Sequence, residues 1–427
     1  MIDVLESAAA EHGSVPAVIA GDGSATYRQL VDRVRPVGGR VCIASPNGLG
    51  WLTAFWSAMA GGATVVALNP RGKADELDYI RRDFLSGELA GPDVCVVQYT
   101  AGTTGLPKGA QLSAAGLMTV ARGQAASWRL NPGDVIFVPN PASHIMGLVL
   151  GCLMPAIGHA TVLTMERFEP GAALELMERH RPVAMAGTPT HFHMLAEHAD
   201  LARRDVSSLR FGLAGGAAST PDAVMKVMER LGLEALLNGY GMSEACGSIS
   251  RTEIGDPVEA HARTAGRPMP WLETRFHEGE LEIRGEPVCT SYLGAGRAVD
   301  DDGWFATGDL FDFDPDGRLV FRGRRSDVIN VGGFNVYPAE VERVLAEHPS
   351  VMQAQVVGVP EPTYGEVPVA FVRLADGASL DAAALASHCA ERLSGYKRPR
   401  QFRPIAEFPL NGAGKVEKYR LRRMARE

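Results

Sequence analysis

The chain has few cysteines, and none of them lies close to another. Six cysteines are spread over 427 residues, with no C-x-x-C pair. Cysteines this scattered exclude a disulfide framework and a cysteine-based zinc site. They indicate reduced thiols, as in a cytoplasmic protein.

The chain also lacks a long apolar run and an excess of positive charge. Its longest apolar stretches, such as GLVLGCLMPAIG, are too short to cross a bilayer. The first residues, MIDVLESAAAEHGS, carry acids rather than a basic segment, so we expect no signal peptide. The formal net charge is −8, which argues against a nucleic-acid partner. We therefore expect a cytoplasmic protein that binds small molecules and no membrane.

Apolar, β-branched runs alternate with helix-like segments over most of the chain. Residues 64–68 (TVVAL) and 134–138 (DVIFV) predict buried strands, and residues 220–232 (TPDAVMKVMERLG) predict a helix. This alternation predicts a layered α/β architecture. Residues 280–286 (ELEIRGE) and 318–324 (RLVFRGR) predict a twisted, antiparallel region.

A smaller unit of mixed helices and strands follows from Arg324 onward. Residues 338–349 and 380–393 predict helices, and residues 351–360 and 367–374 predict strands. We therefore predict two domains, residues 1–323 and residues 324–427.

Residues 99–110, YTAGTTGLPKGA, have the composition of a phosphate-binding loop. They do not match the Walker pattern, because a proline precedes the lysine and a glycine follows it. Backbone N–H groups of such a turn can still bind an anion. A plain strand-to-helix turn is the alternative. The side chains that would assist phosphate binding are Thr100, Thr103, Thr104 and Lys108.

Four more stretches follow this loop: NGYGMSEACG (238–247), GWFATGDL (303–310), GRRSDVINVGGFNVYPAEVE (323–342) and PLNGAGKVEKYRLR (409–422). Together, over about residues 22–422, the five resemble the adenylate-forming superfamily of acyl-CoA synthetases, adenylation domains and luciferases. The resemblance implies an α/β fold: a large layered N-terminal domain, with α/β sheets and a small distorted β-barrel, and a smaller mobile α+β C-terminal domain. The N-terminal lobe is shorter than is usual in this superfamily.

The resemblance implies ATP, Mg²⁺ and coenzyme A as cofactors. Activating a carboxylate through an acyl-adenylate needs positioning and charge neutralisation. The implied nucleotide-binding residues are Thr100, Thr103, Thr104, Lys108, Gly215, Gly216, Ala217, Asn238, Tyr240, Ser243, Asp309, Arg324 and Lys415. Among them, Tyr240 stacks on adenine, and Asp309, helped by Arg324, binds the ribose. The implied catalytic residues are Lys415, at the adenylation transition state, Ser243, at the α-phosphate, and Glu244, which holds Mg²⁺.

The implied acyl pocket is made of His144, Gly187, Thr188, Ala218, Cys246 and Gly247. These residues and their neighbours are small or apolar and include no lysine or arginine. A second carboxylate on the substrate would be buried without a partner. We therefore predict an aryl acid or a short- to medium-chain apolar acid.

The acyl acceptor is predicted from the smaller domain. Gly332 and Gly333 permit close approach of the backbone to the pantetheine arm of coenzyme A, and an ordinary hairpin turn is the alternative. The resemblance places the hinge of domain movement at Ser326. An acyl-AMP ligase that loads a carrier protein or an amine, and a non-catalytic nucleotide-binding relative, are the alternative functions. An acyl carrier protein partner and a homodimer stay open.

Overall fold

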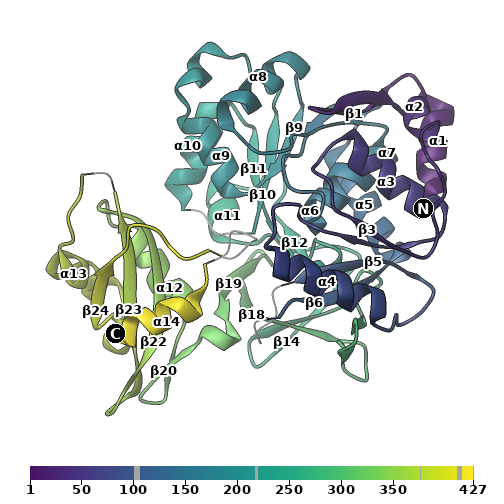
Figure 1. The fold of residues 1–427 in the computed structure, drawn as a ribbon. Helices are drawn as coiled ribbons and strands as arrows, with labels where there is room; N and C mark the ends of the chain where they lie inside the picture. Colours follow the sequence, from purple (N-terminus) through teal and green to yellow (C-terminus); the bar gives the residue numbers. More distant parts are fainter. Residues whose placement is uncertain (101–105, 217–219, 376, 411–415, 427) are drawn as a thin grey trace. The chain divides into compact units, whose positions relative to one another are not determined.

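The computed structural model describes residues 1–100, 106–216, 220–375, 377–410 and 416–426 (Figure 1). The chain divides into two compact units. The first unit comprises residues 1–274 and 283–305, and the second comprises residues 275–282 and 306–427. The predicted boundary between residues 323 and 324 marks where a mobile domain is expected to begin. This division stays a prediction.

A nine-stranded sheet forms the centre of the first unit. Its strands in spatial order are β13 (Arg267–Pro268), β12 (Ser250–Arg251), β11 (Ala235–Tyr240), β10 (Phe211–Gly215), β9 (Ala184–Gly187), β7 (Val135–Phe137), β8 (Thr161–Leu163), β1 (Pro16–Ala20) and β2 (Gly23–Thr26). The strands from β11 to β1 run parallel, and those at both edges pair antiparallel. The inner parallel strands β7, β8, β9 and β10 are almost fully buried, as expected for a sheet covered on both faces.

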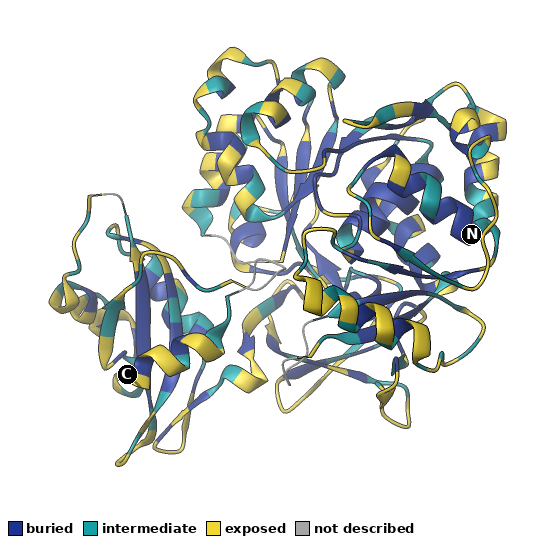
Figure 2. Ribbon diagram, viewed as in Figure 1, coloured by how far each residue is buried: buried dark blue, intermediate teal, exposed yellow. Residues whose placement is uncertain are grey.

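Helices cover this sheet and begin at clear start signals. In Figure 1, α8 (Pro170–His180), α9 (Pro189–Glu197) and α10 (Pro221–Leu231) lie beside β9, β10 and β11. Threonine caps and a proline in the first turn begin α9 and α10. The inward faces of the three helices join the strands in one apolar core, and their outward faces are exposed (Figure 2). The other α-helices of this unit are α1 (Ile2–His12), α2 (Tyr27–Val31), α3 (Leu49–Ala60), α4 (Ala74–Ser86), α5 (Ala114–Trp128), α6 (Ile145–Leu148), α7 (Met154–Gly158) and α11 (Val258–Arg263).

A second, six-stranded sheet carries the predicted phosphate loop. Its order is β17 (Gly296–Arg297), β16 (Ser291–Tyr292), β6 (Lys108–Ser113), β5 (Val94–Thr100), β4 (Thr64–Ala67) and β3 (Arg40–Ile43). Strands β5 and β6 pair antiparallel, with Thr100 opposite Lys108. The loop therefore connects the ends of a hairpin, so the alternative of a plain strand-to-helix turn is wrong.

Two further sheets complete the fold. A four-stranded sheet stands where the small barrel was expected: β14 (Glu273–His277), β15 (Glu280–Arg284), β18 (Phe305–Phe313) and β19 (Leu319–Arg324). The other sheet has the order β21 (Phe334–Val336), β20 (Ile329–Val331), β23 (Gly365–Leu374) and β22 (Val351–Glu361), with β24 (Gln401–Pro404) paired to β23. Three helices accompany it: α12 (Pro338–Ala346), α13 (Ala382–Arg392) and α14 (Lys418–Arg426). The strand and helix predictions for the smaller domain are confirmed.

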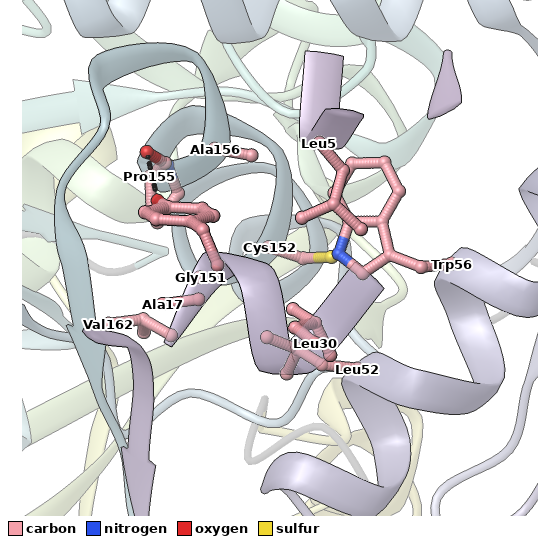
Figure 3. Close-up of a pocket in the computed structure, with 11 residues that line it drawn as sticks. Leu5, Ala17, Leu30, Leu52, Trp56, Gly151, Cys152, Pro155, Ala156 and Val162 are labelled. Atoms are coloured by element: carbon pink, nitrogen blue, oxygen red, sulfur yellow. Dashed lines mark hydrogen bonds between the residues drawn. The ribbon is translucent and has the colours of Figure 1, made fainter. Parts of the chain in front are cut away.

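The gap drawn in Figure 3 lies in the apolar core between helices of the first unit. Leu5 of α1, Leu30 of α2, Trp56 of α3 and Pro155 of α7 line it. The hydroxyl of Tyr27 lies 2.8 Å from the backbone oxygen of Pro155, and burial raises the pKa of this tyrosine. The lining contains no predicted site residue, so we assign the gap to core packing. None of the helices in the described part of the chain combines the length and apolarity that a membrane crossing requires.

Candidate active site

Glu244 is the centre of the described part of the site. It lies in a short 3₁₀ turn, Ser243–Ala245, just after the parallel strand β11. The carboxyl ends of parallel strands are where open α/β sheets bind ligands. The residue is only 8% exposed. Its carboxylate Oε1 accepts hydrogen bonds from Thr100 Oγ1 at 3.3 Å and from Tyr292 Oη at 3.1 Å.

The cation of the predicted loop lies beside the same group. Lys108 Nζ is 5.7 Å from the centroid of the Tyr292 ring, a cation–π distance. Strand β16, which carries Tyr292, pairs with β6, which begins at Lys108. The structure therefore brings Thr100, Lys108 and Glu244 together around Tyr292. Thr103 and Thr104 lie outside the described residues.

The environment of Glu244 keeps neighbouring acidic groups protonated. Burial, followed by the charge of Glu244, raises the pKa of Tyr292, so its hydroxyl remains a hydrogen-bond donor. The same two causes raise the pKa of the Cys289 thiol. Burial is the main cause of the raised pKa of the Cys246 thiol. Neither thiol has the low pKa that a nucleophilic cysteine needs.

The position and chemistry of Glu244 suit its predicted role as a Mg²⁺ ligand. Carboxylate oxygens suit Mg²⁺, a hard cation. Among the described residues, the two hydroxyl donors bond to Oε1, and neither occupies Oε2. Among the residues that the structure describes, no basic side chain forms an ion pair with this buried carboxylate. A buried carboxylate is stabilised when a cation binds it.

The predicted ribose-binding pair is formed in the second unit. Asp309 and Arg324 are opposite each other on β18 and β19. Arg324 Nε lies 3.2 Å from Asp309 Oδ1, with the carboxylate buried and the guanidinium half-exposed. The pairing matches the predicted cooperation of the two residues, and ribose binding stays a prediction.

Asn238 has a structural contact that the sequence did not predict. Its side-chain Nδ2 donates to the backbone oxygen of Thr264 at 2.7 Å, and its backbone N–H donates to Thr252 Oγ1 at 2.8 Å. These bonds fix the end of β11, where Tyr240 is the last residue. Asn238 therefore positions the strand that leads to Glu244.

The segments of Gly215 and Gly247 meet α6, which follows the predicted pocket residue His144. His144 caps this helix, its ring Nδ1 accepting the backbone N–H of Met146 at 3.2 Å. A Cβ atom on Gly215 would lie 2.9 Å from Met146 Cε, and one on Gly247 would lie 3.3 Å from Ile145 Cγ1. Glycine at both positions therefore lets α6 approach the ends of the sheet. Gly216, with φ 91°, follows directly.

Gly187 and Thr188 form the end of β9 and the beginning of α9. Thr188 Oγ1 accepts the N–H of His191, and His191 Nδ1 accepts the N–H of Thr188, which completes a capping box. Burial lowers the pKa of His191 to about 4. Cys246 is fully buried in the left-handed conformation, with φ 51°. Ala217 and Ala218 lie outside the described residues.

Gly332 and Gly333 form the two-residue turn between β20 and β21. Both have positive φ, 59° and 88°, as a tight type I′ hairpin turn requires. Gly332 N–H donates to the backbone oxygen of Tyr364 at 2.7 Å. The hairpin alternative describes the local geometry, and contact with coenzyme A stays a prediction.

Ser326, the predicted hinge, lies in a 3₁₀ turn, Arg325–Asp327. Its backbone oxygen accepts a hydrogen bond from Arg422 Nη2 at 3.4 Å. Lys415 lies outside the described residues.

Two residues near the site were missed by the sequence reasoning. Tyr292 is 48 residues beyond Glu244 and belongs to no recognised motif. Arg251 is only 7% exposed on β12, four residues after Gly247. An arginine within CGSISRT, directly after a site motif, was a signal that could have been noticed.

The fold and the Glu244 cluster define an α/β protein with a buried carboxylate beside a candidate phosphate loop. The sequence pattern of the AMP-binding enzyme family matches residues 85–293, and that of the AMP-binding enzyme C-terminal domain matches residues 340–415. The chain is similar to a 3-[(3aS,4S,7aS)-7a-methyl-1,5-dioxo-octahydro-1H-inden-4-yl]propanoyl:CoA ligase of Rhodococcus jostii (strain RHA1), with 30% identity over 98% of this chain and 97% of the relative. It is 31% identical to a feruloyl-CoA synthase of Amycolatopsis sp, over 95% of each chain.

The chain belongs to the AMP-binding enzyme family, in its acyl-CoA synthetase branch. The alignment with the Rhodococcus relative spans 502 positions, more than the 427 residues present here, as expected for a shortened member. For relatives from Bacillus subtilis (strain 168) and Mycobacterium tuberculosis (strain ATCC 25618 / H37Rv), the aligned part spans 63% and 67% of the relative's length.

Solved structures show the same fold. The o-succinylbenzoate CoA synthetase MenE of Bacillus subtilis, in complex with its acyl-adenylate intermediate, has a TM-score of 0.87 at 26% identity, over 99% of this chain and 98% of that chain. The same enzyme was also solved with ATP and a magnesium ion. The predicted family, fold class and enzyme class, an AMP-forming acid–thiol ligase that uses ATP, Mg²⁺ and coenzyme A, are confirmed.

Proposed function

We propose that this protein activates the carboxylate of an acid whose remaining part is uncharged and largely apolar, and passes the acyl group to coenzyme A. In the first step, a carboxylate oxygen attacks the α-phosphorus of ATP and pyrophosphate leaves. In the second, the thiol of coenzyme A attacks the acyl carbon, and AMP leaves. The observation that carries the proposal is the buried carboxylate of Glu244, which meets Thr100 of the phosphate loop.

The roles of the described residues follow from their positions. Thr100 and Lys108 would bind phosphate oxygens where β5 and β6 end. Glu244 would hold Mg²⁺, which supplies charge neutralisation to the phosphates when bound. Asp309, oriented by Arg324, would accept hydrogen bonds from the ribose hydroxyls. Lys415 would stabilise the charge that develops during adenylation.

The choice of coenzyme A as acceptor is supported by groups around the Gly332–Gly333 turn. A Cβ on Gly332 would touch the Tyr364 ring at 3.4 Å, so backbone and ring lie close together. The guanidinium of Arg400 lies 5.7 Å from the centroid of that ring. Lys397, by contrast, is bound to Glu340 at 2.8 Å. The narrow arm of coenzyme A that carries the thiol would lie along the turn, and Arg400 would meet a phosphate of coenzyme A.

The acid would occupy the space between α6 and the ends of β9, β10 and β11. Apolar or small residues from these elements support an aryl acid or a short- to medium-chain aliphatic acid. A cytoplasmic location is a further prediction from the sequence, which left an acyl carrier protein partner and a homodimer open.

Pyrophosphate release measured with and without coenzyme A tests the proposal. Benzoate, cinnamate and hexanoate are compared with malonate, succinate and free amino acids. We expect benzoate, cinnamate or hexanoate to give an acyl-CoA product. The acid with the highest kcat/KM should be one of these three. If malonate or an amino acid gives the highest kcat/KM, the proposed acid class is wrong. If the acyl-adenylate forms but only a carrier protein or an amine takes up its acyl group, the proposal of coenzyme A as acceptor is wrong.

A further inference from the structure

Arg251 is a buried arginine that lacks an anionic partner. Its side chain donates from Nη1 to Gln124 Oε1 at 2.8 Å, while its Nε has no hydrogen-bond partner among the residues that the structure describes. Among the described residues, no carboxylate forms an ion pair with it. Burial lowers the pKa of Arg251, opposed only by the charge of Glu253. A buried guanidinium is unfavourable unless an acceptor binds it.

Two buried indole N–H groups lie around the same stretch of α5. The Nε1 atoms of Trp128 and Trp271 are both buried and have no acceptor in the described part of the chain. The Trp271 ring packs on Gly123, because a Cβ there would lie 1.9 Å from its Cζ3. Trp128 is one helical turn after Gln124. This part of the core is therefore rich in donors and short of acceptors, which is rare for buried polar groups.

These donors are connected to the proposed acyl pocket. Gln124 Nε2 donates to Ser248 Oγ at 2.9 Å, and Ser248 directly follows Gly247 of the pocket. Gly247 in turn packs on Ile145, next to His144. Arg251 is thus linked through Gln124 and Ser248 to Gly247 of the proposed pocket.

We propose that Arg251 determines the substrate class: the acid carries an acceptor oxygen at the end opposite its activated carboxyl group. The oxygen of a ketone or of a second carboxylate would take the free Nε–H, with the Trp271 N–H as a second donor. This inference rests on the proposed function. It also revises the sequence argument, which found no arginine or lysine around the pocket.

Three acids of equal chain length test the inference: hexanoate, 5-oxohexanoate and adipate. The wild-type enzyme should favour one of the two oxygen-bearing acids over hexanoate by about tenfold to a hundredfold in kcat/KM, which is the value of one charge-assisted hydrogen bond. A preference for 5-oxohexanoate indicates an uncharged acceptor. A preference for adipate indicates a carboxylate acceptor and overturns the uncharged acid class of the proposed function. Arg251→Met should abolish the preference for the oxygen-bearing acids over hexanoate, whereas Arg251→Lys should retain part of it.

Arg267→Met is the matched control, because Arg267 faces Arg251 across β12 and β13 but is 43% exposed. It should keep the wild-type preference. Trp271→Phe, which removes only the N–H, should reduce the preference and carries the test if Arg251→Met does not fold. Equal kcat/KM for all three acids in the wild type, or an unchanged preference in Arg251→Met or Trp271→Phe, overturns this inference alone. Absence of acid activation in the wild type overturns the proposed function as well.

Discussion

Replacing Glu244 with glutamine removes one negative charge while preserving the shape of the site. The amide oxygen of glutamine can still accept the hydroxyls of Thr100 and Tyr292. The existing bonds, at 3.3 and 3.1 Å, are longer than the usual ~2.8 Å for hydroxyl donors. Each is therefore at the weak end of the range, about 0.5 kcal/mol. We expect Glu244→Gln to change the free energy of unfolding by less than about 1 kcal/mol.

The effect on catalysis should be far larger. Without the charge, the site loses the group that would hold Mg²⁺ beside the phosphates. Loss of a comparable electrostatic stabiliser lowers the rate by about a hundredfold to a thousandfold, so we expect that loss in adenylation. The Mg²⁺ concentration needed for half-maximal activity should also rise. Pyrophosphate release at saturating ATP and acid, measured across a Mg²⁺ titration, gives both quantities.

Tyr292→Phe is the control, because it removes one hydroxyl and keeps the charge. A single weak hydrogen bond corresponds to a loss of about twofold to fivefold. The reasoning is refuted if Glu244→Gln stays within this range at every Mg²⁺ concentration. It is also refuted if Tyr292→Phe is as damaging as Glu244→Gln, because the hydroxyl bonds would then matter more than the charge.

Three further predictions concern other parts of the chain. Lys415→Ala should lower adenylation by about a hundredfold or more, yet spare thioester formation from supplied acyl-adenylate; equal loss in both half-reactions would contradict its role. Ser326→Pro fixes φ near −65° and should permit adenylation but block transfer to coenzyme A, with Ser326→Ala as control; normal turnover would show that the hinge lies elsewhere. The pKa of His191 is lowered to about 4 by burial, so the unfolded chain binds the extra proton between pH 6.5 and 4, and stability falls as pH falls through that window. The loss should reach about 3 kcal/mol at most in urea unfolding, and a pH profile unchanged in His191→Asn would contradict it.

The sequence by itself determined the secondary structure and the order of the site motifs. Residues 64–68, 134–138 and 220–232 form β4, β7 and α10 within one or two residues of the predicted bounds. Such elements follow from period, turn residues and caps, which are local properties. The pairing of Asp309 with Arg324 also follows from neighbouring motifs, because β18 and β19 are joined by a short turn.

Only the tertiary structure decided which distant side chains complete the site. Tyr292 reaches Glu244 because β16 pairs with β6 beside the phosphate loop. Arg251 meets Gln124 across 127 residues because α5 packs near β12, the strand next to the sheet edge. The hydrophobic periodicity of the sequence does not reveal such contacts, because they depend on how sheets and helices pack after each has formed. The same packing buries Arg251 beside Gln124, a cation that the sequence argument did not consider.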